Sequence, residues 1–140
     1  MGLLMAAVSL LAAVPATAQD LTVELSIDPV GTVDPRTGDV TITGTITCSP
    51  AADFAGVDGE VRQRVGRQFI SGFFFTFSEP CVGETPFVGE VQRPSGVFKP
   101  GTATVDAFAF GCIEGEDEFV CDDDFETATI RLRPTRGSRS

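Results

Sequence analysis

The sequence predicts an all-β protein built as an antiparallel β-sandwich, and three observations lead to this prediction. Short segments in which apolar and polar residues alternate recur along residues 21–133, and this period is typical of strands with one buried face. Turn-forming residues, including 15 Gly and 9 Pro, separate the segments. Four Cys residues follow a segment typical of an export signal, and this combination in a short chain is typical of disulfide bonds.

The alternating segments predict seven strands. In residues 21–27 every second residue is apolar, and residues 40–48 combine one apolar face with a Thr-rich face suited to solvent. The other five strands are expected at 57–65, 69–77, 87–91, 102–112 and 126–133. Seven short strands in about 120 residues are typical of an immunoglobulin-like β-sandwich.

One expected strand, 69–77, is unusual because Phe73, Phe74 and Phe75 put aromatic side chains on both of its faces. Such a strand is either covered on both sides or belongs to a sheet surface that meets a partner. A third interpretation is that these residues and Phe77 line a cleft for a small apolar ligand. An apolar pocket beside this strand would favour the third interpretation, and a filled core would favour an interaction module.

The N-terminal segment predicts secretion. Residues 1–18 contain an apolar stretch followed by Ala16-Thr17-Ala18, which matches the small-x-small cleavage site of a signal peptide. We expect a mature chain that begins at Gln19, a single domain over 19–133, and a disordered basic tail over 134–140. We expect no membrane span after cleavage.

Composition narrows the classes of function. The formal net charge is −10, which disfavours nucleic acid as a partner because phosphate binding needs a basic surface. The chain has no His, Trp or Tyr, so Ser-His-Asp and Cys-His catalysis and His-containing zinc sites are excluded in their usual forms. We expect a non-enzymatic monomer without a cofactor, whose partner is an unknown extracellular protein or a small ligand.

Residues 111–126 carry eight carboxylates and no Lys or Arg. We expect a solvated, exposed hairpin tip. A calcium site is the alternative, with Asp122, Asp123 and Asp124 as candidate ligands, although the spacing of an EF-hand loop is absent. A basic protein partner is a further interpretation of the same charges.

Three motifs carry a resemblance to a known family. The stretch 38–48 ends in Cys48, Pro80-Cys81-Val82-Gly83 follows the Phe-rich segment, and 98–107 reads FKPGTATVDA. Together they resemble an uncharacterised family of small secreted actinobacterial proteins, a domain of unknown function. The resemblance implies a secreted immunoglobulin-like domain with a Cys48–Cys81 disulfide.

The remaining cysteines, Cys112 and Cys121, would then close the turn between the last two strands. A second resemblance leaves a rival pairing open. Asp106, Phe110 and Cys112 resemble the Asp, Tyr and Cys of immunoglobulin strand F, which implies Cys48–Cys112 with Cys81–Cys121.

Overall fold

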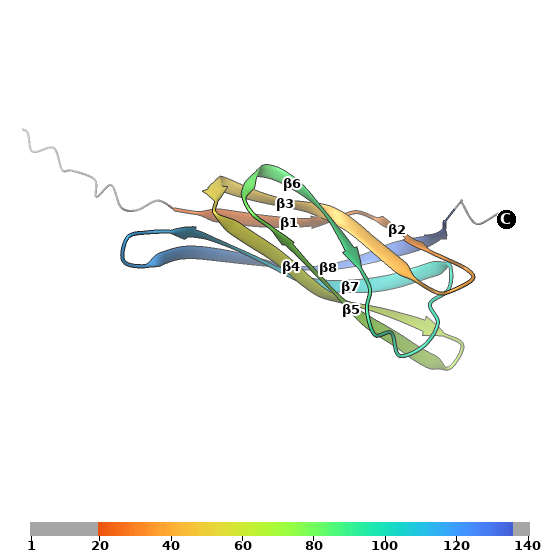
Figure 1. The fold of residues 1–140 in the computed structure, drawn as a ribbon. Coiled ribbons are helices and arrows are strands. Elements are labelled where there is room, and N and C mark those ends of the chain that lie inside the picture. The colour runs from red at the N-terminus through yellow and green to blue at the C-terminus, as the bar shows by residue number, and fades with distance from the viewer. Residues whose placement is uncertain (1–19, 136–140) are drawn as a thin grey trace, which may run out of the picture.

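The structure is a computed structural model that describes residues 20–135 and forms two packed β-sheets (Figure 1). Its eight strands are β1 (Thr22–Ile27), β2 (Val30–Val33), β3 (Val40–Ala52), β4 (Phe54–Val65), β5 (Gln68–Ser78), β6 (Cys81–Glu90), β7 (Gly101–Glu114) and β8 (Phe119–Pro134). In this part of the chain there is no helix with the length and apolarity needed to cross a membrane. The predicted all-β fold is confirmed.

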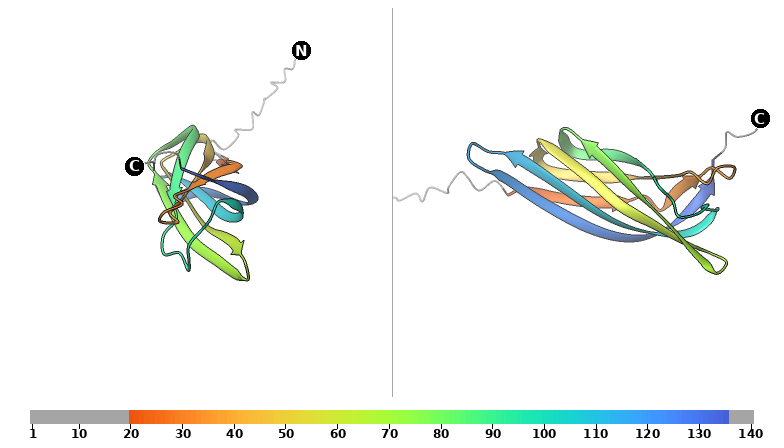
Figure 2. Two further views of the ribbon diagram at one scale, coloured as in Figure 1. Left: turned by 90° about the vertical axis from the view of Figure 1, so that its right-hand side faces the viewer. Right: turned by 60° about the horizontal axis from the view of Figure 1, so that its bottom comes forward.

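The strand order is that of an immunoglobulin-like sandwich. One sheet has the order β1-β3-β6 and the other has the order β8-β7-β4-β5, with antiparallel neighbours throughout. The short strand β2 joins the sheets at one edge, because it pairs antiparallel with β3 and parallel with β8. At the other edge the sheets meet at a single bridge between Phe73 and Gln92. The two layers and their elongated shape are visible in Figure 2.

Several boundaries differ from the expected ones. Strand β2 was not predicted, because four residues between two turns are too few to show a period. Strand β6 begins at Cys81 rather than residue 87, and β8 begins at Phe119 rather than residue 126. Strand β8 continues to Pro134, and the Thr135 N–H donates to the Val33 carbonyl at 3.0 Å. The first two residues of the expected tail therefore belong to the domain, whereas the expected signal peptide and residues 136–140 lie outside the described residues.

The core lies between the sheets and is built from large rings set against small residues. The rings of Phe74 in β5 and Phe87 in β6 stack with centroids 6.4 Å apart. Glycines leave room for them: a Cβ atom on Gly59 of β4 would lie 2.6 Å from the Phe74 ring, and one on Gly44 of β3 would lie 2.7 Å from the Phe87 ring. The buried residues of β7 are likewise small, with Ala at 103, 107 and 109. Phe74 of the Phe-rich strand is therefore a core residue.

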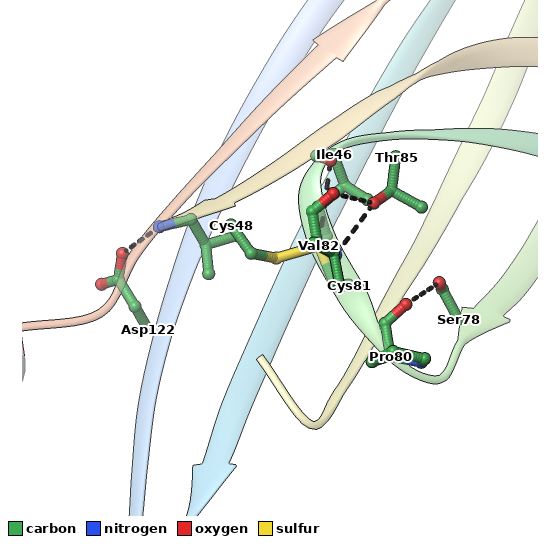
Figure 3. The surroundings of a disulfide bond; sticks show 9 residues. Ile46, Cys48, Ser78, Pro80, Cys81, Val82, Thr85 and Asp122 are labelled. Carbon is green, nitrogen blue, oxygen red and sulfur yellow. Dashed lines mark hydrogen bonds between the residues drawn. A yellow bond between two sulfur atoms is a disulfide. The ribbon is translucent and has the colours of Figure 1, made fainter. Parts of the chain in front are cut away.

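Both favoured disulfides are confirmed. Cys48–Cys81 joins β3 to β6 within the first sheet, with the Cys81 sulfur 3.9 Å from the Ile46 carbonyl oxygen (Figure 3). Cys112–Cys121 joins directly opposite residues of β7 and β8, whose Cα atoms are 4.1 Å apart.

The rival pairing is wrong because of the alternation of side chains along β7. Gly111 faces the core, where a Cβ atom on it would lie 3.6 Å from the Cys48 sulfur. Cys112 is the next residue, so its side chain points to the other face of the sheet, away from Cys48.

Candidate functional site: an aromatic sheet face

The outer faces of the two sheets differ sharply in chemistry. The outer face of the first sheet carries the Thr ladder of β3, at positions 41, 43, 45 and 47, as expected from the sequence. The outer face of the second sheet carries nine of the twelve Phe residues. We call this surface the aromatic face, and its rings belong to Phe54, Phe69, Phe73, Phe75, Phe77, Phe108, Phe110, Phe119 and Phe125.

Strand register brings these rings together from four strands. Asp58 in β4 is opposite Phe75 in β5 on one side and opposite Phe108 in β7 on the other. Phe108 is in turn opposite Phe125 in β8. Because directly opposed side chains lie on the same face of a sheet, three rings and one carboxylate form a row across the sheet.

The aromatic face is open to solvent. Seven of its rings are exposed by 37% to 72% of their surface. Exposed Phe residues are ordinary when scattered singly, whereas contiguous apolar patches are typical of interaction surfaces, ligand-binding grooves and aggregation-prone faces.

On the part of the aromatic face nearest the β7–β8 turn, four Phe rings form a cluster of ring–ring contacts. Phe54 lies at the centre of this cluster, with its ring centroid 6.3 Å from that of Phe77, 6.4 Å from Phe110 and 6.0 Å from Phe119. The contact with Phe77 is stacked and the other two are edge-to-face, which are the favoured geometries for aromatic pairs. The Cys112–Cys121 disulfide crosses the sheet beside Phe54 and holds this end of the hairpin.

An open groove of about 550 Å³ runs through the middle of the aromatic face. Rings from three strands form its apolar lining, at Phe73, Phe75, Phe108 and Phe125. Three carboxylates also line it, those of Asp58, Glu60 and Asp106. The groove therefore offers apolar contact area with a local negative charge.

One arginine partly neutralises that charge. The Arg62 Nη2 atom lies 2.6 Å from an Asp106 carboxylate oxygen, and its Nε atom lies 3.8 Å from a Glu60 carboxylate oxygen. The other oxygen of Asp106 accepts a hydrogen bond from the Thr127 hydroxyl at 2.8 Å. Asp58, by contrast, forms no ion pair or side-chain hydrogen bond with any residue in the described range.

Most of the acidic segment is paired strand, and its carboxylates are exposed or half-buried as expected. Only residues 115–118 form the turn between β7 and β8. Asp122 accepts a hydrogen bond from the Val23 N–H at 2.8 Å, and Asp124 accepts one from the Leu25 N–H at 2.8 Å. Asp122 is drawn with this bond in Figure 3. These two carboxylates thus serve as hydrogen-bond acceptors for two backbone N–H groups on the edge of β1 that does not pair with β3.

The three candidate calcium ligands do not converge. Side chains alternate along β8, so Asp123 lies on the aromatic face whereas Asp122 and Asp124 point toward β1. Across residues 20–135 there is no group of three or more acidic or Cys side chains placed to hold a metal ion. The calcium hypothesis stays a prediction.

The sequence identified only part of this site. It pointed to Phe73, Phe75 and Phe77, which lie on the aromatic face, and to Phe74, which does not. It missed the rings of β7 and β8. The available signal was the run Ala107-Phe108-Ala109-Phe110, in which small residues on one strand face alternate with rings on the other. Two apolar faces on a strand outside the Phe-rich segment indicate that the aromatic surface extends across the sheet.

A second, smaller cleft of about 270 Å³ opens between the sheets at the β5–β6 edge. Its lining includes the core residues Ile46, Val57 and Phe87 together with the polar residues Thr76 and Ser78. This cleft is less suited to an apolar ligand than the groove on the aromatic face.

Comparisons with known proteins give no relative for this chain: no family model, curated protein or solved structure matches it.

Proposed function

We propose that this protein is a secreted, non-catalytic binding module whose contact surface is the aromatic face. The observation that carries the proposal is the set of seven exposed rings on one face of one sheet. Keeping so much apolar surface in water is unfavourable, because each Å² costs about 25 cal/mol relative to burial. A partner that covers the face relieves this cost.

Two further observations support the proposal. The two disulfides are compatible with an extracellular location, where oxidising conditions maintain such bonds. The residue inventory contains no His, and the aromatic face presents carboxylates between rings rather than a nucleophile beside a base.

A second candidate function is the carriage of a small apolar ligand in the groove. The groove favours it, since four rings line a volume within the usual range of ligand sites, roughly 300–1,000 Å³. Native mass spectrometry of the protein purified from culture medium distinguishes the two functions. A small bound molecule that is lost on replacing Phe108 with Ser would support the carrier.

Site-specific photo-crosslinking tests the binding module. A photoreactive phenylalanine analogue replaces Phe75 on the aromatic face, and in a matched control it replaces Thr45 on the outer face of the other sheet. The labelled proteins are added to the culture from which the protein is secreted. We expect protein adducts from position 75 and few or none from position 45.

The mass of each adduct identifies what covers the face. An adduct of the chain with itself and an adduct with another protein both support the binding module. Equal adduct yields at positions 75 and 45, with or without a small ligand in the groove, would show that the aromatic face is not a protein contact surface.

A further inference from the structure

We propose that the aromatic face is covered by a second copy of the same chain, in an antiparallel dimer with two-fold symmetry. The inference rests on the proposed function, because it names the partner of the same surface. The sequence alone predicts a monomer. The size of the aromatic face and the distribution of charge along the molecule are the reasons to propose a dimer instead.

The area of the aromatic face matches what a stable dimer needs. The exposed fractions of its seven rings amount to about four complete Phe side chains. At roughly 150–250 Å² for each aromatic side chain, this is about 600–1,000 Å² of apolar surface. A standard specific interface buries about 800 Å² on each partner. The rings alone therefore supply the surface of one side of such an interface.

Charge is segregated along the length of the molecule. Every Lys and Arg in the described part of the chain lies toward the end that holds the β4–β5 turn and the end of β8: Arg36, Arg62, Arg64, Arg67, Arg93, Lys99, Arg131 and Arg133. The opposite end, at the β7–β8 turn, carries carboxylates without a described base among them. In Figure 1 these two ends are the right and left ends of the sandwich.

The same segregation holds on the aromatic face itself. At one end, Arg131 in β8 is opposite Thr102 in β7, and Arg64 lies two residues beyond Arg62 on β4. At the other end lie Asp123, opposite Phe110, and Glu114, opposite Phe119. The face therefore runs from a basic end, through a band of rings that includes the carboxylates of the groove, to an acidic end.

This polarity selects one of the two face-to-face arrangements. A two-fold axis that runs across the strands reverses the strand direction of one copy over the other, and places the basic end of each copy over the acidic end of its partner. An axis along the strands would instead stack like charges on like charges, which is unfavourable. Because each chain carries a net charge of −10, only an arrangement that opposes unlike charges offsets the mutual repulsion of the copies.

A dimer of this kind is closed. Both copies use the same patch, so the contact is isologous and leaves no aromatic face free for a third copy. We therefore expect a discrete dimer rather than a concentration-dependent series of larger assemblies.

Analytical ultracentrifugation and light scattering of the mature protein measure the assembly state. We expect twice the mass of a single chain at micromolar concentration. Phe75→Asp puts a charge in the middle of the face and should weaken dimerisation by about tenfold or more, as expected at the centre of an interface. Val88→Asp, at a similarly exposed valine of β6 in the other sheet, is the matched control and should leave the mass unchanged.

Charge exchange tests the antiparallel geometry. The variant Arg64→Glu/Arg131→Glu makes both ends of the face acidic, and Glu114→Arg/Asp123→Arg makes both ends basic. Each variant alone should dimerise about tenfold more weakly than the wild type, through like-charge opposition. An equimolar mixture should form a heterodimer with affinity near that of the wild type. A melting curve for each variant verifies folding.

The possible results separate this inference from the proposed function. A wild-type protein that is monomeric at about 100 μM, far above the micromolar Kd of an ordinary interface, would overturn the dimer. A dimer that is insensitive to Phe75→Asp, or charge variants that dimerise as well as the wild type, would also overturn it. In each case an adduct with another protein at position 75 would leave the binding module standing, and the absence of any adduct there would remove both.

Discussion

At the scale of single residues, Gln63 is the one fully buried polar or charged residue among residues 20–135. It is buried in β4, with 4% of its surface exposed. Its Nε2 atom donates to the Lys99 carbonyl at 2.7 Å and to the Thr102 carbonyl at 3.3 Å, and its Oε1 atom accepts from the Lys99 N–H at 2.9 Å. The side-chain amide of Gln63 therefore supplies hydrogen bonds that a neighbouring strand would otherwise make with the backbone of residues 99–102, where the chain enters β7.

Replacing Gln63 with Leu should destabilise the protein by about 1–3 kcal/mol, because Leu cannot form the three part-buried hydrogen bonds that Gln63 makes with the backbone of Lys99 and Thr102. Chemical denaturation measures the change in the free energy of unfolding. Gln68→Leu, at an exposed position of β5, makes the same chemical change without such bonds and should shift stability by less than about 0.5 kcal/mol. Equal effects of the two substitutions would contradict the assigned role of Gln63.

At the scale of elements, the acidic stretch of β8 is explained by the edge of β1. Strand β1 pairs with β3 on one side only, so alternate N–H groups on its other side need acceptors. Two carboxylates of β8 supply them, and they attach β1 to the second sheet without a backbone ladder. An edge closed in this way is protected from pairing with another chain.

Asp124→Ala should cost about 1–3 kcal/mol of stability, since the Leu25 N–H loses a charged acceptor. Asp123→Ala is the matched control, because it removes the same charge from the neighbouring residue on the opposite face. Hydrogen exchange provides a local measure: the Leu25 amide should exchange faster in Asp124→Ala and at the wild-type rate in Asp123→Ala. Similar exchange in both variants would show that the Asp124 bond does not hold β1.

At the scale of the whole molecule, the sandwich has two unlike outer faces and two unlike ends. One face is a Thr ladder and the other is aromatic, while one end is basic and the other acidic. In the proposed function the aromatic face is the surface that a partner covers, and in the proposed dimer the two ends determine the orientation of the second copy.

The net charge also predicts the response of stability to salt. Screening of repulsion among the carboxylates should raise the melting temperature with added sodium chloride. Calcium at matched ionic strength should raise it by the same amount, because Asp122 and Asp124 already accept backbone hydrogen bonds and Asp123 points away from them. A calcium-specific rise that disappears in the variant with Asn at positions 122–124 would instead establish a binding site.

Much of the fold follows from the sequence alone. The period of two in segments such as 21–27 and 40–48 specifies strands with one buried face, and the observed β1 and β3 agree. The favoured cysteine pairing was also correct, although it depended on a resemblance as well as on residue patterns. Local patterns suffice for these features because side-chain alternation is a property of the extended backbone itself.

The aromatic face was decided by the tertiary structure. Period alone shows that Phe73 and Phe75 share a side of their strand, but not whether that side meets the core or the solvent. The register of β4, β5, β7 and β8 makes the decision, because it places Phe108 and Phe125 in the same row on the outer side. The same holds for Asp122 and Asp124. Their carboxylates act as hydrogen-bond acceptors only because the tertiary structure places the edge of β1 beside β8. Which face a residue occupies depends on partners distant in sequence, and local alternation carries no information about them.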